Sequence, residues 1–186
     1  NPWNVTTTGA VPWPDDDGPT RIACVGRLDP RAKGQDLILE VLAARKWRDR
    51  PIEVHFYGHG PCESSLRGLA AHLGTTNTCF HGRVTDVARI WAENHALILP
   101  SRFEGMPLAI LEAMWCGRPV ITTHVAGNAE HLREGVNGFI AEAPTAALLD
   151  GAMERAWAER CHWKRIGLRA RADVLGLLPD DPCAAF

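Results

Sequence analysis

The sequence predicts a three-layer α/β domain in which helices cover both faces of a parallel sheet of roughly six strands. Short apolar runs of strand length alternate with longer segments of helical periodicity along most of the chain. Several of the apolar runs end in a glycine or a proline, where a buried strand gives way to a loop. Strand, helix and parallel strand in repeated order form crossover units, and such units build a Rossmann-like domain.

The first half of the predicted domain contains three strand–helix units, after an irregular opening. Residues 1–19 are rich in Pro, Gly, Thr and Asp, and we interpret them as a linker or extended lead-in, with the domain over 20–186. Buried strands are expected at 20–26 and 52–58, and a shorter strand at 77–82. Helical spacing of apolar residues predicts helices over 34–47, over 62–74 with Gly74 as the stop, and over 84–95 with Thr85 as the N-cap.

The second half of the predicted domain repeats this unit. A fourth strand is expected at 96–100, followed by a helix over about 107–116. Pro107 suits the first helical position because its missing N–H costs nothing there, and Gly117 is a natural stop. A fifth strand follows at 118–123, then a turn at Gly127 and Asn128 into a helix that opens with Ala129. A short sixth strand at 138–142 and two helices, near 145–160 and 162–175, complete the domain.

Composition and charge limit the classes of function. Hydrophobic residues make up 46% and charged residues 23%, which indicates a globular domain. The formal net charge of -2 gives no reason to expect electrostatic binding to nucleic acid. The six cysteines show no CxxC spacing, so we expect a reduced, cytosolic protein. Basic residues gather toward the C-terminal end of the sequence, and they indicate either a solvated helix face or a membrane-surface patch: Arg155, Arg160, Lys164, Arg165, Arg169 and Arg171.

The loops that follow the strands are the expected ligand edge, because parallel α/β sheets bind ligands at the carboxyl ends of their strands. After the first strand, Arg27 and Lys33 offer a planar fork and a point charge, which together suit a diphosphate. The alternative is that Asp29 and Asp36 neutralise them. After the second strand, Gly58 and Gly60 allow a backbone to approach a ligand closely, although a plain tight turn explains this spacing equally well.

Two glutamates flank the start of the helix after the fourth strand. Glu104 lies in the loop, and Glu112 lies more than a turn inside an otherwise apolar helix. A buried carboxylate is costly unless it has hydrogen-bond partners, and ribose hydroxyls are such partners. A salt bridge to a neighbouring arginine is the alternative. The free amides at the start of the same helix, with those of Gly105 and Met106, are suited to phosphate oxygens.

Several motifs together resemble a known family. The segments "VGRL…KG", "GHGP", "HGRV", "LPSRFEGMPLAILEAMWCGRPVI" and "AGNAEHLREGVNGFI" look like the C-terminal half of a family 4 retaining glycosyltransferase with the GT-B fold. The resemblance runs from about residue 20 almost to the end of the chain. It implies that the chain is one half of a GT-B fold, namely the Rossmann-like domain that binds a nucleotide-diphosphate sugar.

The resemblance also implies roles for individual residues. Arg27 and Lys33 would bind the donor diphosphate, Glu104 would contact the donor sugar hydroxyls near the reacting carbon, and Glu112 would hold the ribose. The other donor-binding residues would be Gly105, Met106, Pro107 and Leu108 at the phosphates, Arg83 and Val84 beside the base, and Gly58 and Gly60 in the loop where His59 replaces an acidic residue frequent in the family.

No metal or other cofactor is expected, since the cations would perform the electrostatic work of a metal. The "DDD" of Asp15–Asp17 lies before the first strand, which is the wrong place for a metal-binding DxD motif, and the histidines form no HExxH motif that would indicate zinc.

The partners implied by the resemblance are the donor and a missing N-terminal acceptor-binding domain. The full-length protein would be cytoplasmic, with peripheral contact to the inner face of the membrane allowed, and the fragment alone inactive. The alternatives are a non-catalytic nucleotide-binding module and half of a GT-B-like epimerase or phosphorylase.

Overall fold

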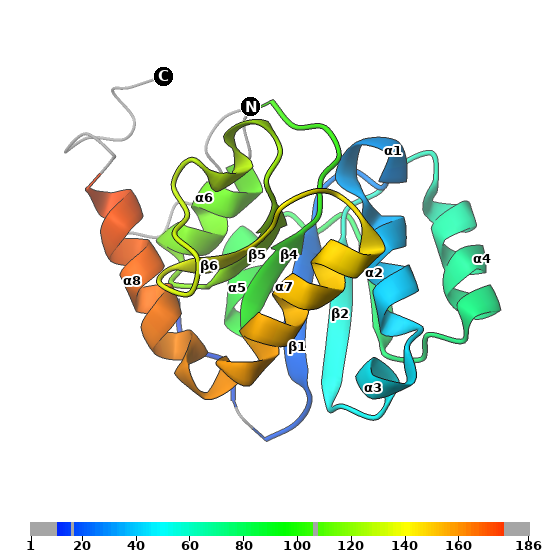
Figure 1. Cartoon of the computed structure of the whole chain (residues 1–186), viewed down its shortest axis with the longest axis horizontal. Coiled ribbons are helices and arrows are strands. Elements are labelled where there is room, and N and C mark those ends of the chain that lie inside the picture. Colours follow the sequence, from blue (N-terminus) through cyan, green and yellow to red (C-terminus); the bar gives the residue numbers. More distant parts are fainter. Residues whose placement is uncertain (1–10, 16, 106–107, 177–186) are drawn as a thin grey trace.

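The computed structural model describes residues 11–15, 17–105 and 108–176, and it confirms the predicted three-layer α/β architecture (Figure 1). Six parallel strands form one sheet in the order β3-β2-β1-β4-β5-β6. The strands are β1 (Thr20–Val25), β2 (Ile52–Tyr57), β3 (Thr78–Gly82), β4 (Ala96–Leu99), β5 (Val120–Thr123) and β6 (Gly138–Ala141). The helices are α1 (Pro30–Lys33), α2 (Gln35–Leu42), α3 (Arg45–Arg48), α4 (Glu63–Leu73), α5 (Val87–Glu93), α6 (Leu108–Trp115), η1 (Ala126–Ala129), α7 (Ala146–Ala158), η2 (Arg160–His162) and α8 (Trp163–Leu175).

Alternate residues of the strands build two apolar cores, one on each face of the sheet. Ile22 and Phe56 point into the core beneath α2, α4 and α7, which contribute residues such as Leu39 and Met153. Ala23 and Leu97 point the other way, into the core beneath α5, α6 and the later part of α8. Burial on both faces explains why the central strand β4 is a continuous apolar run, whereas the edge strand β3 is exposed at alternate residues. None of the helices within the described residues is long and apolar enough to cross a membrane.

Three predicted element boundaries were wrong. The helix expected over 34–47 is divided into α2 and α3, because Ala44 adopts an extended backbone with ψ 137°. Asp86, not Thr85, caps α5, since its side chain accepts a hydrogen bond from the Arg89 amide at 3.1 Å. The helix expected to open at Ala129 is instead the short 3₁₀ helix η1, which ends at that residue.

The described part of the lead-in, residues 11–15, packs on the domain through the buried side chain of Arg118. The Arg118 guanidinium donates to the carbonyls of Trp91 and Asn94 at the end of α5 and to the carbonyl of Pro12 in the lead-in. It also lies 4.9 Å from the ring centroid of Trp13. Carbonyl groups at a helix C-terminus lack partners within the helix and favour a cation, so these carbonyls stabilise the buried charge of Arg118. Burial lowers the pKa of Arg118 to about 10, which still leaves it charged at neutral pH.

The order of the strands determines where on the sheet a ligand is expected to bind. The chain runs from β1 outward through β2 to β3, and then returns to β4 on the other side of β1. The loops after β1 and β4 therefore diverge at the carboxyl edge, at the switch point where α/β sheets form their binding crevice.

Candidate functional site

The loops at the switch point bring Lys33 and Glu104 into direct contact. The Lys33 Nζ atom lies 2.5 Å from the Glu104 Oε2 atom, and Ser101 Oγ lies 3.2 Å from the same oxygen. Only 22% of the Lys33 side chain and 8% of the Glu104 side chain are exposed, so the pair is shielded from the screening that weakens surface salt bridges. Two residues 71 positions apart in the sequence thus share one cation–carboxylate contact.

The position of Lys33 follows from the turn that joins α1 to α2. Gly34 has φ +67°, a left-handed conformation, and its Cα faces the Pro100 carbonyl so closely that a Cβ atom there would lie 2.0 Å from the oxygen. The amides of Arg102 and Phe103 donate to the Ala32 carbonyl at 2.8 and 3.0 Å. These contacts seat the α1 turn directly on the loop after β4.

Arg102 reinforces this contact between the two loops. Its guanidinium forms a bidentate pair with Asp36 at 2.6 and 2.9 Å and donates to the Pro30 carbonyl at 2.7 Å. Asp29 lies 3.5 Å from Arg31. The alternative that Asp29 and Asp36 neutralise Arg27 and Lys33 is therefore wrong, since both carboxylates pair with other arginines.

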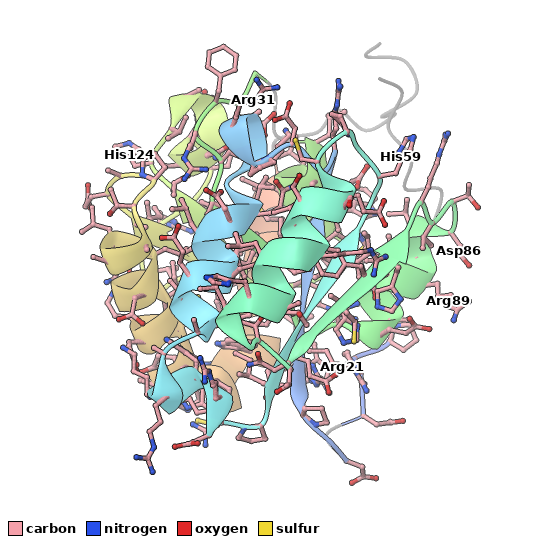
Figure 2. All side chains as sticks on the ribbon, turned by 90° about the vertical axis from the view of Figure 1, so that its right-hand side faces the viewer. Arg21, Arg31, His59, Asp86, Arg89 and His124 are labelled. Carbon is pink, nitrogen blue, oxygen red and sulfur yellow. The ribbon has the colours of Figure 1, made fainter. Side chains whose placement is uncertain are left out.

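A pocket of about 500 Å³ opens among the loops that follow β1, β2 and β3. Its lining contains two exposed arginines and four consecutive residues that include a histidine: Arg27, Arg83, Gly58, His59, Gly60 and Pro61. Figure 2 shows His59 and Arg31 toward the upper end of the molecule, where the strands end, and Arg21 of β1 toward the lower end. Within the described ranges no salt bridge involves Arg27 or Arg83, so the pocket presents two unpaired positive charges suited to an anionic ligand.

Gly58 and Gly60 allow one protein loop to approach another. Gly58 has φ +136°, and a Cβ atom on it would lie 2.0 Å from the Gly26 carbonyl oxygen. A Cβ atom on Gly60 would lie 2.3 Å from the Leu28 carbonyl oxygen. The Leu28 amide donates to the His59 carbonyl at 3.2 Å, which ties the two loops together. The close backbone approach inferred from the sequence thus occurs between the loops themselves, and it shapes the wall of the pocket.

Glu112 lies in α6 as the sequence predicted, and it is 7% exposed. Burial raises the pKa of its carboxyl to about 7. Among the residues that the structure describes, no salt bridge reaches this carboxylate, so the predicted alternative of a structural ion pair finds no support there. A buried acid without a cationic partner is a polar group held ready for another partner.

The remaining predicted site residues lie around this edge or outside the description. Gly105 is exposed in the loop after β4, and Leu108 is the first residue of α6. Val84 is partly buried and packs against the core beneath α5. Met106 and Pro107 lie outside the described residues.

Sequence reasoning assigned no role to two polar residues near the ligand edge, Ser101 and Gln35, and placed a third, Asn128, only in a turn. Ser101 donates a hydrogen bond to Glu104. This role could have been predicted, because Ser101 stands at the start of the sequence segment that contains Glu104. Gln35 is 1% exposed and donates to the Arg27 carbonyl at 2.8 Å, which fixes the backbone that carries Arg27. Asn128 is 1% exposed, and both atoms of its amide lack a hydrogen-bond partner among the described residues. The burial of the two amides depends on tertiary packing, which no local sequence pattern reports.

Comparison with known proteins assigns the chain to a family. The model of the family described as glycosyl transferases group 1 matches residues 19–159, which include the switch-point pair, the pocket and Glu112. The chain belongs to the glycosyl transferases group 1 family. This group 1 domain is 26% identical over 144 residues to a putative glycosyltransferase, EpsD, of Bacillus subtilis, a match that covers 77% of this chain and 38% of EpsD.

Solved structures support the same fold for the group 1 domain. TarM of S. aureus superposes with a TM-score of 0.77 at 20% identity, over 90% of this chain and 35% of TarM. HepE of Anabaena, solved in complex with UDP and glucose, superposes with a TM-score of 0.75 at 23% identity, over 86% of this chain and 44% of HepE. The likeness to these two structures confirms the predicted Rossmann-like α/β fold. The chain spans less than half the length of EpsD, TarM and HepE.

Proposed function

We propose that this group 1 domain is the C-terminal, donor-binding half of a retaining family 4 glycosyltransferase, which transfers a sugar from a nucleotide-diphosphate sugar without a metal ion. The observation that carries the proposal is the Lys33–Glu104 contact at the switch point, close in sequence to the unpaired Arg27 of the pocket. A cation and a carboxylate placed together there are complementary to the two ends of a sugar diphosphate. The UDP bound by the structural neighbour HepE is consistent with a ligand of this class.

In this proposal the salt bridge is the resting arrangement of the site. Lys33 turns from Glu104 to the donor diphosphate, and Glu104 is released to accept hydrogen bonds from the sugar hydroxyls near the reacting carbon. Arg27 supplies a second positive charge from the pocket. In a retaining transfer the leaving diphosphate gains negative charge on the face where the acceptor attacks, and cations already brought to the diphosphate by donor binding stabilise that charge at the moment of transfer. The backbone amides of Gly105 and Leu108, before and at the start of α6, would add further donors to the phosphates.

The rest of the ligand follows the pocket and α6. We assign the ribose to Glu112, since a carboxylate accepts hydrogen bonds from two hydroxyl groups at once. Because the Glu112 carboxyl is buried, such hydrogen bonds would offset the cost of removing it from water. The base lies beside Arg83 and Val84, against the walls formed by Gly58 and Gly60.

Residues 1–19 form the lead-in from a preceding domain that binds the acceptor. Phe103 is consistent with such a neighbour, because it is 75% exposed in the loop that holds Glu104. The full-length enzyme is proposed to be cytoplasmic, with peripheral contact to the inner face of the membrane.

Nucleotide titration tests the donor site directly. Calorimetry with UDP, GDP and ADP is expected to show binding of at least one nucleotide to the 186-residue chain. Arg27→Ala is expected to weaken this binding by about 10- to 100-fold, since a hydrogen bond to a charged group contributes roughly 1.5–3 kcal/mol. Arg31→Ala is the matched control, because Arg31 is also exposed on the adjacent α1 turn but pairs with Asp29 and does not line the pocket. Absence of nucleotide binding, or equal binding by both variants, would contradict the site assignment.

The isolated chain is expected to bind the donor without transferring its sugar. The acceptor in the proposal is held by the preceding domain, and positioning of the second reactant supplies much of the rate of a bimolecular transfer. The measurement is release of free nucleotide from UDP- and GDP-sugars, with candidate acceptors present, compared with binding of the same donors by calorimetry. Robust transfer by the 186 residues alone would remove the need for a second domain.

A further inference from the structure

The free edge of the sheet carries a group of metal-ligating side chains that do not line the ligand pocket. His55 of β2 lies opposite Cys79 of β3, and Glu53 precedes His55 by two residues, so it points to the same face. This is the face opposite α4, because the alternate residue Phe56 is buried in the core beneath α2 and α4. In Figure 2, α4 lies on one side of the β3 strand, and Asp86 and Arg89 lie on the other.

The three side chains converge. One ligand atom from each of Glu53, His55 and Cys79 lies within 4.8 Å of the other two, the only such group of three found among the described residues. The His55 Nε2 atom is 3.1 Å from the Glu53 Oε2 atom. His55 is 9% exposed, and Cys79 lies at the surface. A nitrogen, an oxygen and a sulfur therefore face one point that is open to solvent on the cysteine side.

A fourth residue holds the central imidazole. The His81 Nε2 atom lies 3.2 Å from the Nδ1 atom of His55, and the His81 ring stacks on Tyr57 with centroids 4.6 Å apart. Since Nδ1 of His55 is engaged by His81, its Nε2 atom is the one directed at Glu53. Metal-binding histidines use one ring nitrogen for the metal and the other for a hydrogen bond that fixes the tautomer, and His81 provides that bond.

Hydrogen bonding alone accounts for the Glu53–His55–His81 chain, but it gives no reason for a thiol at the same point. Imidazole nitrogen, thiolate sulfur and carboxylate oxygen are the three ligand types that Zn²⁺ accepts, at about 2.0–2.3 Å. The three ligand atoms already lie within 4.8 Å of one another, so binding one ion would draw them only slightly closer together. The exposed side leaves room for water in the fourth position.

We propose that Glu53, His55 and Cys79 bind a Zn²⁺ ion, with His81 as the positioning residue for His55. The expectation of no zinc rested on the absence of a motif within a single element, whereas these ligands come from two strands and meet only through the sheet. The ion ties Cys79 of the edge strand β3 to β2, and so steadies the strand that ends at Gly82 and leads into Arg83 of the pocket. It is separate from the sugar transfer proposed above, in which no metal takes part.

Cobalt and zinc titrations of the metal-free chain test the proposal. Co²⁺ is expected to bind with a stoichiometry of one and to give a thiolate-to-cobalt charge-transfer band. Zn²⁺ is expected to displace it and to raise the melting temperature with the logarithm of its concentration above Kd. Cys79→Ser is expected to abolish the band, and Glu53→Gln to weaken binding. His81→Ala is expected to retain the band but lower the affinity by about 10- to 100-fold, as loss of an outer hydrogen bond does.

Cys161→Ser is the matched control. Cys161 is also exposed, with its Sγ atom 3.7 Å from His162 Nδ1, and His162 is in turn 2.9 Å from Glu159, yet these three do not converge on one point. Its band and affinity are expected to equal those of the parent. The proposal is overturned if the parent gives no thiolate band and no thermal shift with Zn²⁺, if Cys79→Ser behaves as the parent does, or if the band is lost in Cys161→Ser instead.

Discussion

Gly34→Ala is expected to destabilise the domain by roughly 3–5 kcal/mol, near the upper end of single-substitution effects. The new Cβ atom would lie 2.0 Å from the Pro100 carbonyl oxygen, and a backbone atom cannot move aside as a side-chain end does. The left-handed backbone at φ +67° adds about 1–2 kcal/mol for a residue with a Cβ atom. Relief of the clash requires the α1 turn to leave the loop after β4, which separates Lys33 from Glu104. Urea unfolding measures the loss of stability.

Gly74→Ala isolates the contribution of the clash. Gly74 has almost the same conformation, with φ +65°, but nothing lies within 4 Å of a Cβ atom there. We expect this control to lose only about 1 kcal/mol. If Gly34→Ala unfolds no more readily than Gly74→Ala, the close packing of α1 on the loop after β4 is incorrect. Nucleotide affinity should fall in the Gly34 variant and remain unchanged in the Gly74 variant.

Glu112→Gln is expected to stabilise the ligand-free domain above neutral pH while weakening nucleotide binding. The pKa of Glu112 rises from 4.5 in the unfolded chain to about 7 in the folded domain because of burial. Between these values the folded state binds more protons than the unfolded state, so the stability falls as the pH rises. At about 1.4 kcal/mol per pH unit, the contribution of this group falls by roughly 3 kcal/mol and levels off above pH 7.

Urea unfolding across pH 4 to 8 tests this sign. The difference in stability between the Gln variant and the parent should grow across this range and then stay constant, because the amide does not ionise. Glu130→Gln is the control, since Glu130 is exposed, and it should change neither the pH profile nor nucleotide affinity. A parent whose stability rises through this range relative to Glu112→Gln would mean that the carboxylate is paired in the folded state. Equal nucleotide affinity of Glu112→Gln and the parent would contradict the ribose assignment.

The fold was predictable because its signals are local. Continuous apolar runs and helical spacing report each element separately, and the alternation of elements then gives the parallel sheet. The ligand edge followed from the same rule. The Lys33–Glu104 contact did not, because it depends on β4 returning to the side of β1. Neither did the meeting of Arg27 with Arg83, which requires the loops after β1 and β3 to share one wall with the loop after β2.

Other parts of the site were hidden for a related reason. The spacing of Gly58 and Gly60 indicated close backbone approach, but only the structure shows that the Gly26 and Leu28 carbonyls are the groups approached. The grouping of Glu53 and His55 with Cys79 arises from strand register, which fixes partners that sequence separation does not indicate. Residue types and loop membership were thus readable from the chain, whereas partners across loops and strands were not.

The buried Arg118 has a mechanical consequence. A single guanidinium joins the end of α5 to the Pro12 carbonyl, and the Trp13 ring covers it, so residues 11–14 turn with the sheet as one body. In the proposed two-domain enzyme, the clamped segment would give the chain a fixed direction where it enters this domain. This point of entry lies at the amino edge of the sheet, opposite the edge where the donor is proposed to bind.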